Sequence, residues 1–416
     1  MSINSALLAG VSGLVANSSA LAAISDNIAN VNTVAYKRNQ VNFANVVTAQ
    51  AVKGKYSAGG VQGVTRQFVS TQGLIQASGS ATDLAISGDG FFIVSNKGAG
   101  LTAADPRSFT RQGSFSVDAD GFLKNDSGLY LQGWPVQPGG AFVTPPSDLT
   151  ALAPINVKNL GSAVSPTANI AVSANIDKVS ATAPTPVDIN IVDAAGGKHT
   201  LRLSFAQTSV NNWNMTAAIY PTAADGPITP ASPIPVVFNT DGSINTVGGV
   251  APTAFSVNVA WAAALGLPAQ PINVDLTKLS QFDEPSSVGS ISQDGAGAGN
   301  VVAIDVDEDG VVSAIYDNSQ VRKVAKIGLA TFPNADGLAQ VSGNAYRSTM
   351  DAGEMVIKQA GTGGAGRVSP SSLEASTVDL SAEFTGLIQT QKAYSASSKI
   401  ITTADQMLEE LINIKR

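Results

Sequence analysis

The acidic run between Asp305 and Gly310 has residue types and a spacing that could bind a metal ion. A calcium loop places carboxylates at alternate positions and a bidentate Glu at its twelfth position. That position holds Tyr316, and apolar residues alternate on both sides of the run, which indicates strands rather than helices. We therefore expect a hairpin turn with crowded carboxylates. Weak cation binding by Asp305, Asp307 and Asp309 is the alternative.

Other candidate chemistry is sparse. The glycines at 361–366 match a GxGxxG spacing, but Ser369-Pro370 interrupts before any helix could start, so a linker is expected and not a dinucleotide site. His199 is the only histidine, and the chain has no cysteine. Thiolate metal sites, disulfides and cysteine nucleophiles are excluded, and a surface or edge-strand position is expected for His199. We predict no catalytic residue, no metal site and no cofactor.

Charge further narrows the function classes. Of 416 residues only 13% are charged, with 24 basic and 31 acidic side chains and a net charge of −7. This balance argues against a nucleic-acid partner. No apolar run approaches about 20 residues, so no membrane insertion is expected. Lys37 is the first basic residue and only Asp26 precedes it, unlike a secretory signal. We expect the chain either to stay in the cytoplasm or to be exported without a cleaved signal peptide.

The middle of the chain is predicted to be β structure. All 20 prolines lie between Pro106 and Pro370, and Asp-Gly pairs recur through this region. Asp-Gly between alternating apolar residues is a strong hairpin signal. The segments 114–123 and 301–316 both have this pattern. We therefore expect mainly antiparallel strands between two proline-free ends.

Both ends show a sevenfold apolar spacing that is typical of a coiled-coil seam. It predicts helices over 3–33 and 372–414. An uncharged Ser- and Asn-rich face on the first helix favours packing against further copies, and an ordinary intramolecular helix hairpin is the alternative. The residues expected to pack in a polymer core are Leu7, Val11, Leu14, Leu21, Ile24, Ile28, Val31, Leu380, Phe384, Leu387, Tyr394, Ile401 and Leu408.

The predicted fold class is multidomain. An α-helical coiled-coil domain pairs the two ends (1–35 and 370–416), and two mainly antiparallel β domains form a nested insertion. The connectors are 36–74 and 358–369, the inner β domain is 75–140 and 285–357, and the inserted outer β domain is 141–284. Hinge glycines are expected at Gly59, Gly60, Gly63, Gly361, Gly363, Gly364 and Gly366.

Two terminal motifs carry a family resemblance. The stretch 22–37, AAISDNIANVNTVAYK, resembles the N-terminal signature of bacterial flagellar rod and hook proteins, and 373–408 resembles their C-terminal signature. AISGDGFF at 85–92 is similar to the family's inner β domain. Ser376-Thr377 departs from the usual Ser-Asn. Signature residues are Asn27, Asn30, Asn32, Thr33, Tyr36, Asp379, Gln391, Lys399 and Asp405.

The resemblance implies a structural homopolymer and not an enzyme. The large middle insertion favours the hook members of the family, whose tubular polymer is a flexible, torque-transmitting joint between rod and filament. Implied partners are identical copies, the distal rod protein, the hook cap protein, the hook–filament junction protein and the flagellar type III export machinery. The implied location is the flagellar hook, outside the cell. Alternatives are a rod protein, or a secreted β-rich adhesin or carbohydrate-binding protein.

Overall fold

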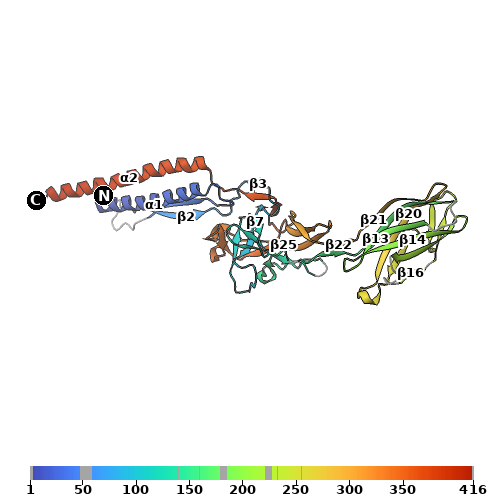
Figure 1. Cartoon of the computed structure of the whole chain (residues 1–416). Coiled ribbons are helices and arrows are strands. Elements are labelled where there is room, and N and C mark those ends of the chain that lie inside the picture. Colours follow the sequence, from blue (N-terminus) through green and yellow to red (C-terminus); the bar gives the residue numbers. More distant parts are fainter. Residues whose placement is uncertain are drawn as a thin grey trace. The chain divides into compact units, whose positions relative to one another are not determined.

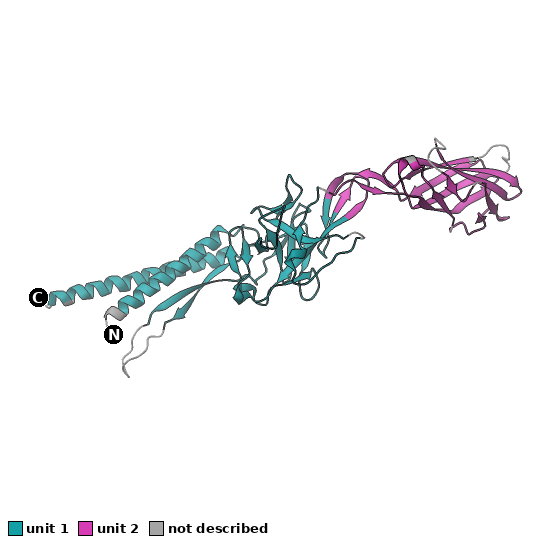
Figure 2. Ribbon diagram, turned by 90° about the horizontal axis from the view of Figure 1, so that it is seen from below, with its two compact units in different colours: residues 1–159, 304–313, 323–416 teal, residues 160–303, 314–322 magenta. Residues whose placement is uncertain are grey.

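The computed structural model describes residues 3–46, 59–137, 140–158, 160–178, 185–220, 227–231, 233–253 and 255–414. The chain forms two compact units. Unit 1 comprises residues 1–159, 304–313 and 323–416, and unit 2 comprises 160–303 and 314–322; Figure 2 colours them separately. Part of the expected first connector, 47–58, lies outside the described residues.

Helices occupy both ends of the chain, as predicted: α1 spans Ile3–Ala29 and α2 spans Leu380–Ile414 (Figure 1). Each is shorter than expected at its inner end. The Asn30 amide donates to the carbonyl of Asp26 at 2.9 Å and accepts from the Thr33 hydroxyl at 3.0 Å, so local side-chain bonds turn the chain after α1. Before α2, residues Ser372–Glu374 form strand β30 and cannot be helical.

The apolar content of α1 is higher than the lengths of its uninterrupted apolar runs indicate. The segment Ala6–Ala29 is long and apolar enough to cross a membrane by length and composition, with a mean hydropathy of 1.7. Asp26 is the single charged residue of α1, and its interrupting residues are small Ser, Gly and Asn. Such residues break an apolar run without lowering the mean hydropathy very far.

A hairpin lies where the first connector was expected. Strands β1 (Asn39–Asn45) and β2 (Val61–Gln67) pair antiparallel and pack along α1. Gly63 faces the helix, where an added Cβ would lie 3.4 Å from the Cα of Ala16 and 3.0 Å from Val41. Ala20 and Ala23 are buried with Val41. Small side chains therefore form the buried face of α1 within one chain.

Unit 1 contains a sheet of antiparallel pairs in the order β23-β24-β25-β9-β5-β6-β27-β26, with β10, β28, β7 and β8 attached to it. Its buried core includes Phe91, Ile93, Trp134 and Tyr346. The strand bounds are β3 Ile75–Ala77, β4 Leu84–Ser87, β5 Phe91–Ser95, β6 Arg107–Thr110, β7 Phe115–Val117, β8 Leu123–Asn125, β9 Tyr130–Pro135, β10 Ala153–Pro154, β23 Val301–Val306, β24 Val311–Tyr316, β25 Val321–Thr331, β26 Ala339–Val341, β27 Ala345–Arg347, β28 Val356–Gln359, β29 Arg367–Pro370 and β30 Ser372–Glu374; short 3-10 turns are η1 Leu149–Ala151, η4 Ala335–Gly337 and η5 Met350–Ala352.

Unit 2 has two five-stranded sheets around one large apolar core. Their orders are β16-β19-β20-β12-β21 and β13-β14-β15-β17-β18, and β11 pairs with β22 as a separate ribbon. The bounds are β11 Ala163–Ser165, β12 Asn169–Asp177, β13 Thr185–Val192, β14 Lys198–Ser209, β15 Asn212–Tyr220, β16 Ile228–Thr229, β17 Ile234–Phe238, β18 Ile244–Val247, β19 Ser256–Val259, β20 Gln270–Phe282, β21 Ser287–Gln293 and β22 Ala296–Gly299, with η3 at Ala263–Leu265.

The prediction of a β-rich body with mainly antiparallel pairing is confirmed. The pair β12–β20 is parallel and is the exception among the described pairings. Both hairpins expected at Asp-Gly turns are present: β7 pairs with β8, and β23 neighbours β24. Gly121 and Gly310 have φ of 89° and 76°, a conformation that glycine adopts without a Cβ clash.

Candidate assembly surface and its anchoring junction

A buried ion cluster joins the segment after α1 to the segment before α2. Nζ of Lys37 lies 2.6 Å from Oε1 of Glu374, and both side chains are fully buried. Nη1 of Arg111 lies 3.4 Å from the other carboxylate oxygen. Lys37 also donates to the carbonyl of Thr71 at 2.5 Å, and the backbone N–H of Gly73 donates to Glu374 at 2.7 Å. The Glu374 carboxylate thus holds the segment after α1 and the segment before α2 against the β structure of unit 1.

The electrostatics of this junction are those of an apolar interior. Burial lowers the pKa of Lys37, and the Glu374 carboxylate opposes that change. Burial raises the pKa of the nearby Tyr346 hydroxyl well above its usual 10, and the charge on Glu374 raises it further. A charge in such surroundings is stable only with its partners in place.

Asn27 fastens the end of α1 to the start of β1. Its fully buried side chain donates to the carbonyl of Asn39 at 2.8 Å and accepts from the backbone N–H of the same residue at 2.9 Å. The Tyr36 hydroxyl donates to the same amide oxygen at 3.3 Å. Two signature residues therefore have a structural role, because they fix the angle at which the chain leaves the helix.

The start of α2 is fixed in a similar way. The Asp379 carboxylate accepts the backbone N–H groups of Ser381 and Ala382 at 2.8 and 3.2 Å, which is an N-cap. One turn further, the buried Glu383 carboxylate lies 2.5 Å from Nε of Arg38. The Arg38 backbone N–H donates to the Thr377 hydroxyl at 3.0 Å. Thr377, a departure from the family signature, thus contributes to the junction.

The two helices pack as an antiparallel pair through small residues (Figure 1). A Cβ added to Gly10 would lie 3.1 Å from Ile401, and one added to Gly13 would lie 3.1 Å from the Ser397 hydroxyl. At the other end, Gly386 faces Ile24. Glycine at these positions lets the helix axes approach closely.

Most residues of the predicted polymer core remain accessible in one chain. Val11, Leu380, Phe384 and Tyr394 are exposed by 48, 39, 52 and 40%. The others are half-buried: Leu7, Leu14, Leu21, Ile24, Ile28, Val31, Leu387, Ile401 and Leu408. Among the signature residues, Asn30 and Thr33 are half-buried, and Asn32, Asp379, Gln391, Lys399 and Asp405 are exposed.

The expected hinge glycines lie in hydrogen-bonded turns and strands. Gly63 is in β2, and the carbonyl of Gly60 accepts from Val46 at 3.1 Å, while Gly59 is half-buried beside it. In the second connector, the N–H of Gly361 donates to the carbonyl of Gly366 at 2.8 Å, which closes a tight loop between β28 and β29. No strand–loop–helix unit surrounds this loop, as the sequence predicted.

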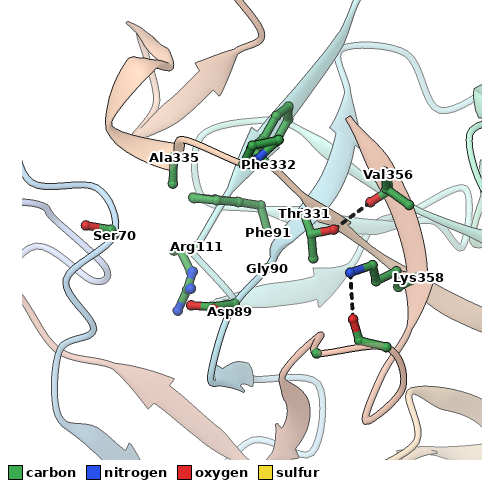
Figure 3. Close-up of a pocket in the computed structure, with 13 residues that line it drawn as sticks. Ser70, Asp89, Gly90, Phe91, Arg111, Thr331, Phe332, Ala335, Val356 and Lys358 are labelled. Atoms are coloured by element: carbon green, nitrogen blue, oxygen red, sulfur yellow. Dashed lines mark hydrogen bonds between the residues drawn. The ribbon is translucent and has the colours of Figure 1, made fainter. Parts of the chain in front are cut away.

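The same loop borders a cavity of about 430 Å³ in unit 1 (Figure 3). Phe91 and Phe332 supply apolar walls, and the Arg111 guanidinium carbon lies 5.2 Å from the centre of the Phe91 ring. Across the cavity, Lys358 donates to the carbonyl of Gly363 at 2.6 Å. Arg111 already contacts Glu374 and the Phe91 ring, and Lys358 already binds a loop carbonyl. These side chains therefore stabilise the loop.

The acidic run forms the predicted turn. Asp307 accepts the N–H of Val311 at 2.8 Å, and Gly310 donates to the carbonyl of Asp307 at 3.0 Å. Within the described residues, no group of three or more His, Cys, Asp or Glu is arranged to hold a metal ion, Asp305 and Asp309 included. His199 lies in β14, between two other strands and not at an edge, and Nε2 is 2.8 Å from the Asp193 carboxylate.

Sequence reasoning missed the junction cluster. Lys37, Arg38, Arg111, Glu374 and Glu383 are ordinary charged residues in the sequence, and charged side chains are usually solvated. The available signal was their position in a chain with few charges, because Lys37, Glu374 and Glu383 lie within the two terminal signatures and Arg38 directly follows the first.

Comparison with known proteins assigns the class. Residues 7–37 match the family "Flagella basal body rod protein", and 85–182 match "Flagellar hook protein FlgE/F/G D1 domain". Residues 159–296 match "Flagellar basal body protein FlaE D2 domain", and 369–414 match "Flagellar basal body rod FlgEFG protein C-terminal". The chain is thus built from the parts of a flagellar rod or hook protein.

Full-length relatives narrow the assignment. The flagellar hook protein FlgE of Caulobacter vibrioides is 37% identical, with 100% of both chains covered. Those of Rhizobium meliloti and Salmonella typhimurium are 31 and 30% identical and cover 100 and 97% of this chain. The chain belongs to the flagellar hook protein FlgE family, and it is a structural subunit of the flagellar hook. This is a structural family and not an enzyme family.

Proposed function

We propose that the chain polymerises through α1 and α2 into a helical tube. The β structure of unit 1 and the whole of unit 2 then lie outside the helical layer. The exposed apolar side chains of the two helices carry this proposal. Phe384 and Ile388 are 52 and 53% exposed, and Val11 is 48% exposed. One chain leaves these side chains in water, and copies of the same helices would cover them. Heterologous contacts that do not close into a ring generate a helical filament.

In this polymer the helix pair acts as an antiparallel coiled coil. Gly10 and Gly13 hold α1 close to α2 within one copy, which leaves the sevenfold apolar residues free to pack between copies. The anchoring junction transmits force from the helices to the β units, because its buried charges tolerate no separation.

The domains follow a nested order. The helical domain comprises 1–35 and 370–416, and the connectors are 36–74 and 358–369. The inner β domain takes 75–140 and the return segment from 285–357, except that β21 and β22 group with the outer β domain, expected at 141–284, because they belong to unit 2. The arrangement of unit 2 between segments of unit 1 along the chain supports this order.

The tube serves as a flexible joint that transmits torque between rod and filament. Bending requires that subunits lengthen and shorten their contacts during each revolution. The stiff helix pair resists twisting. The segment with Gly59, Gly60 and Gly63 and the loop with Gly361–Gly366 allow tilting, and the sparsely charged outer domains slide over one another. Sliding is easier where few ion pairs fix a register, and solvent-exposed ion pairs contribute little free energy.

The partners are other copies of the chain, the distal rod protein, the hook cap protein and the hook–filament junction protein. Export through the flagellar type III machinery, without a cleaved signal peptide and without membrane insertion of α1, delivers the subunit to the outside of the cell. The absence of cysteine supports export as an unfolded chain, since no disulfide must form or open.

Polymerisation of the purified full chain tests this function. Electron microscopy is expected to show curved tubes. Deleting residues 1–33 should abolish them while the β units stay folded, as judged by circular dichroism. Straight tubes would indicate a rod-like shaft instead.

A matched pair of variants places the contact on the helices. Phe384→Ser is expected to slow tube growth at least tenfold. Phe282→Ser removes a phenylalanine with nearly the same exposure, 51%, from the end of β20 in unit 2, and it should polymerise normally. Equal effects of both variants would contradict assembly through the helices.

A further inference from the structure

Within the described residues, the one charged side chain of α1, Asp26, has no ion-pair partner. Asp26 is the single charged residue between Ile3 and Ala29, and its side chain is exposed. Among the described residues, its carboxylate forms no ion pair or side-chain hydrogen bond. The residues beside it on the exposed face are small: Ala22, Ser25 and Ala29. A small face with one acidic group lets another helix approach closely and meet the charge.

A complementary surface lies on α2. A groove of about 420 Å³ is lined by residues of this one helix, Ile388, Gln391, Lys392, Ser395, Ala396 and Lys399. Their spacing of three and four residues places them on one face. Lys392 and Lys399 are exposed and, within the described part of the chain, have no acidic partner. The groove therefore offers two cations beside an apolar side chain, Ile388, that is 53% exposed.

The two surfaces cannot meet within one chain. The antiparallel pairing puts Gly13 beside Ser397 and Ile24 beside Gly386, so Asp26 lies roughly level with Phe384. At about 1.5 Å per residue, Lys392 is then about 12 Å further along the axis, and Lys399 is about 22 Å away. An Asp26 side chain that reaches this groove therefore comes from another molecule.

We propose that the α2 groove of one copy receives the Asp26 face of α1 from a second copy. This inference rests on the proposed polymerisation and specifies one of its contacts. Asp26 then lies against Lys392 or Lys399, and the small residues around it seat on Ile388 and Ala396. Because α1 has no other charge, this ion pair sets the axial register between neighbouring copies, which a purely apolar seam would leave free to slip.

Charge reversal in the full chain tests the proposal. Asp26→Lys is expected to slow seeded tube growth at least tenfold, as is the double variant Lys392→Asp/Lys399→Asp. Asp26→Glu, which keeps the charge, should grow normally. Asp26→Lys is then combined with Lys392→Asp and, separately, with Lys399→Asp. One of the two combinations should restore growth, and the position that does so identifies the partner.

A mixing experiment establishes that the contact is between copies. Asp26→Lys alone and Lys392→Asp/Lys399→Asp alone should each grow tubes at least tenfold more slowly than wild type, whereas an equimolar mixture of the two should grow normally. Wild-type growth by Asp26→Lys, or failure of both double reversals and of the mixture, would overturn this inference and leave the proposed function intact. Failure of the wild-type chain to polymerise would overturn the function itself.

Discussion

Nζ of Lys37 lies 2.6 Å from Oε1 of Glu374, although 337 residues separate them in the sequence. This contact places the end of the N-terminal helical segment against the start of the C-terminal one. Arg111, from the β structure of unit 1, approaches the same carboxylate. Three distant parts of the chain therefore share one buried anion, and a change at that anion should be felt in all three.

Removing the charge of Glu374 should be costly. Glu374→Gln leaves two buried cations without a counter-charge, and we expect the free energy of unfolding to fall by about 3–5 kcal/mol. Urea unfolding of unit 1, monitored by the fluorescence of buried Trp134, measures this loss of stability. The control is Glu308→Gln, whose pair with Arg367 is 70 and 64% exposed and should change stability by less than about 0.5 kcal/mol.

Asn27 and Asn32 are both signature residues but should behave differently. Asn27→Ala leaves the N–H and the carbonyl of half-buried Asn39 without these partners, so a loss of about 1–3 kcal/mol is expected. Asn32 is exposed, and Asn32→Ala should cost less than about 0.5 kcal/mol. Thermal unfolding of both variants compares them. Similar losses would show that Asn27 is not a clamp.

The stability of unit 2 should depend on pH through Asp294. Burial would raise the pKa of this carboxyl, but the backbone N–H groups of Asn169 and Ala168 and the Asn169 side chain outweigh it and lower the pKa below 3.8. A carboxyl with a lowered folded pKa stabilises the protein above its unfolded pKa, and this stabilisation is lost as pH falls through the folded value.

The comparison is between wild type and Asp294→Asn in urea. The wild type should be the more stable from pH 5 to 7, and the difference should shrink below about pH 4. The exposed Asp283→Asn serves as a control whose difference from wild type should stay near zero. A difference that is constant down to pH 2 would contradict the role of Asp294.

The loop between β28 and β29 needs glycine at position 364. Gly364 has φ of 82° and no heavy atom within 4 Å of an added Cβ, so an alanine there would meet backbone strain alone. Gly364→Ala should lower the unfolding free energy by about 1 kcal/mol. Gly79 has equally open surroundings without a positive φ, and Gly79→Ala should leave stability unchanged or slightly higher.

The helical ends should be the least protected parts of an unassembled chain. Most α2 side chains beyond Ile388 are exposed, and helices gain most of their stability from packing. Amide exchange in 390–414 is expected within seconds in dilute protein, while β5 and β14 stay protected. The same amides should exchange far more slowly in tubes. Protection of both ends before assembly would contradict this picture.

The sequence predicted the helices, the β-rich middle and the Asp-Gly hairpins because each depends on local chemistry. The β1–β2 hairpin was missed, since Gly63 and Arg66 interrupt any apolar alternation in β2. Leucine spacing did not reveal the face of α1 that packs on the β1–β2 hairpin. On that face Ala16 contacts Gly63, and the two can approach closely because both are small.

The anchoring junction was beyond sequence reasoning for a different reason. A charged residue in a sequence carries no mark of its partner, and the Lys37–Glu374 pair exists only because the fold brings the two ends together. The proposed assembly surface was easier to predict, because apolar residues at sevenfold spacing stay recognisable whether a partner in the same chain or another copy covers them.

The ribbon of β11 and β22 makes unit 2 an exchangeable module. Ala163 and Gly299 are direct partners across this ribbon, so the stretch that builds both five-stranded sheets starts and finishes at one point. A hook of different girth or surface chemistry can then evolve, or be engineered, by grafting another folded segment with adjacent termini onto the same two strands. The terminal helices would need no compensating change.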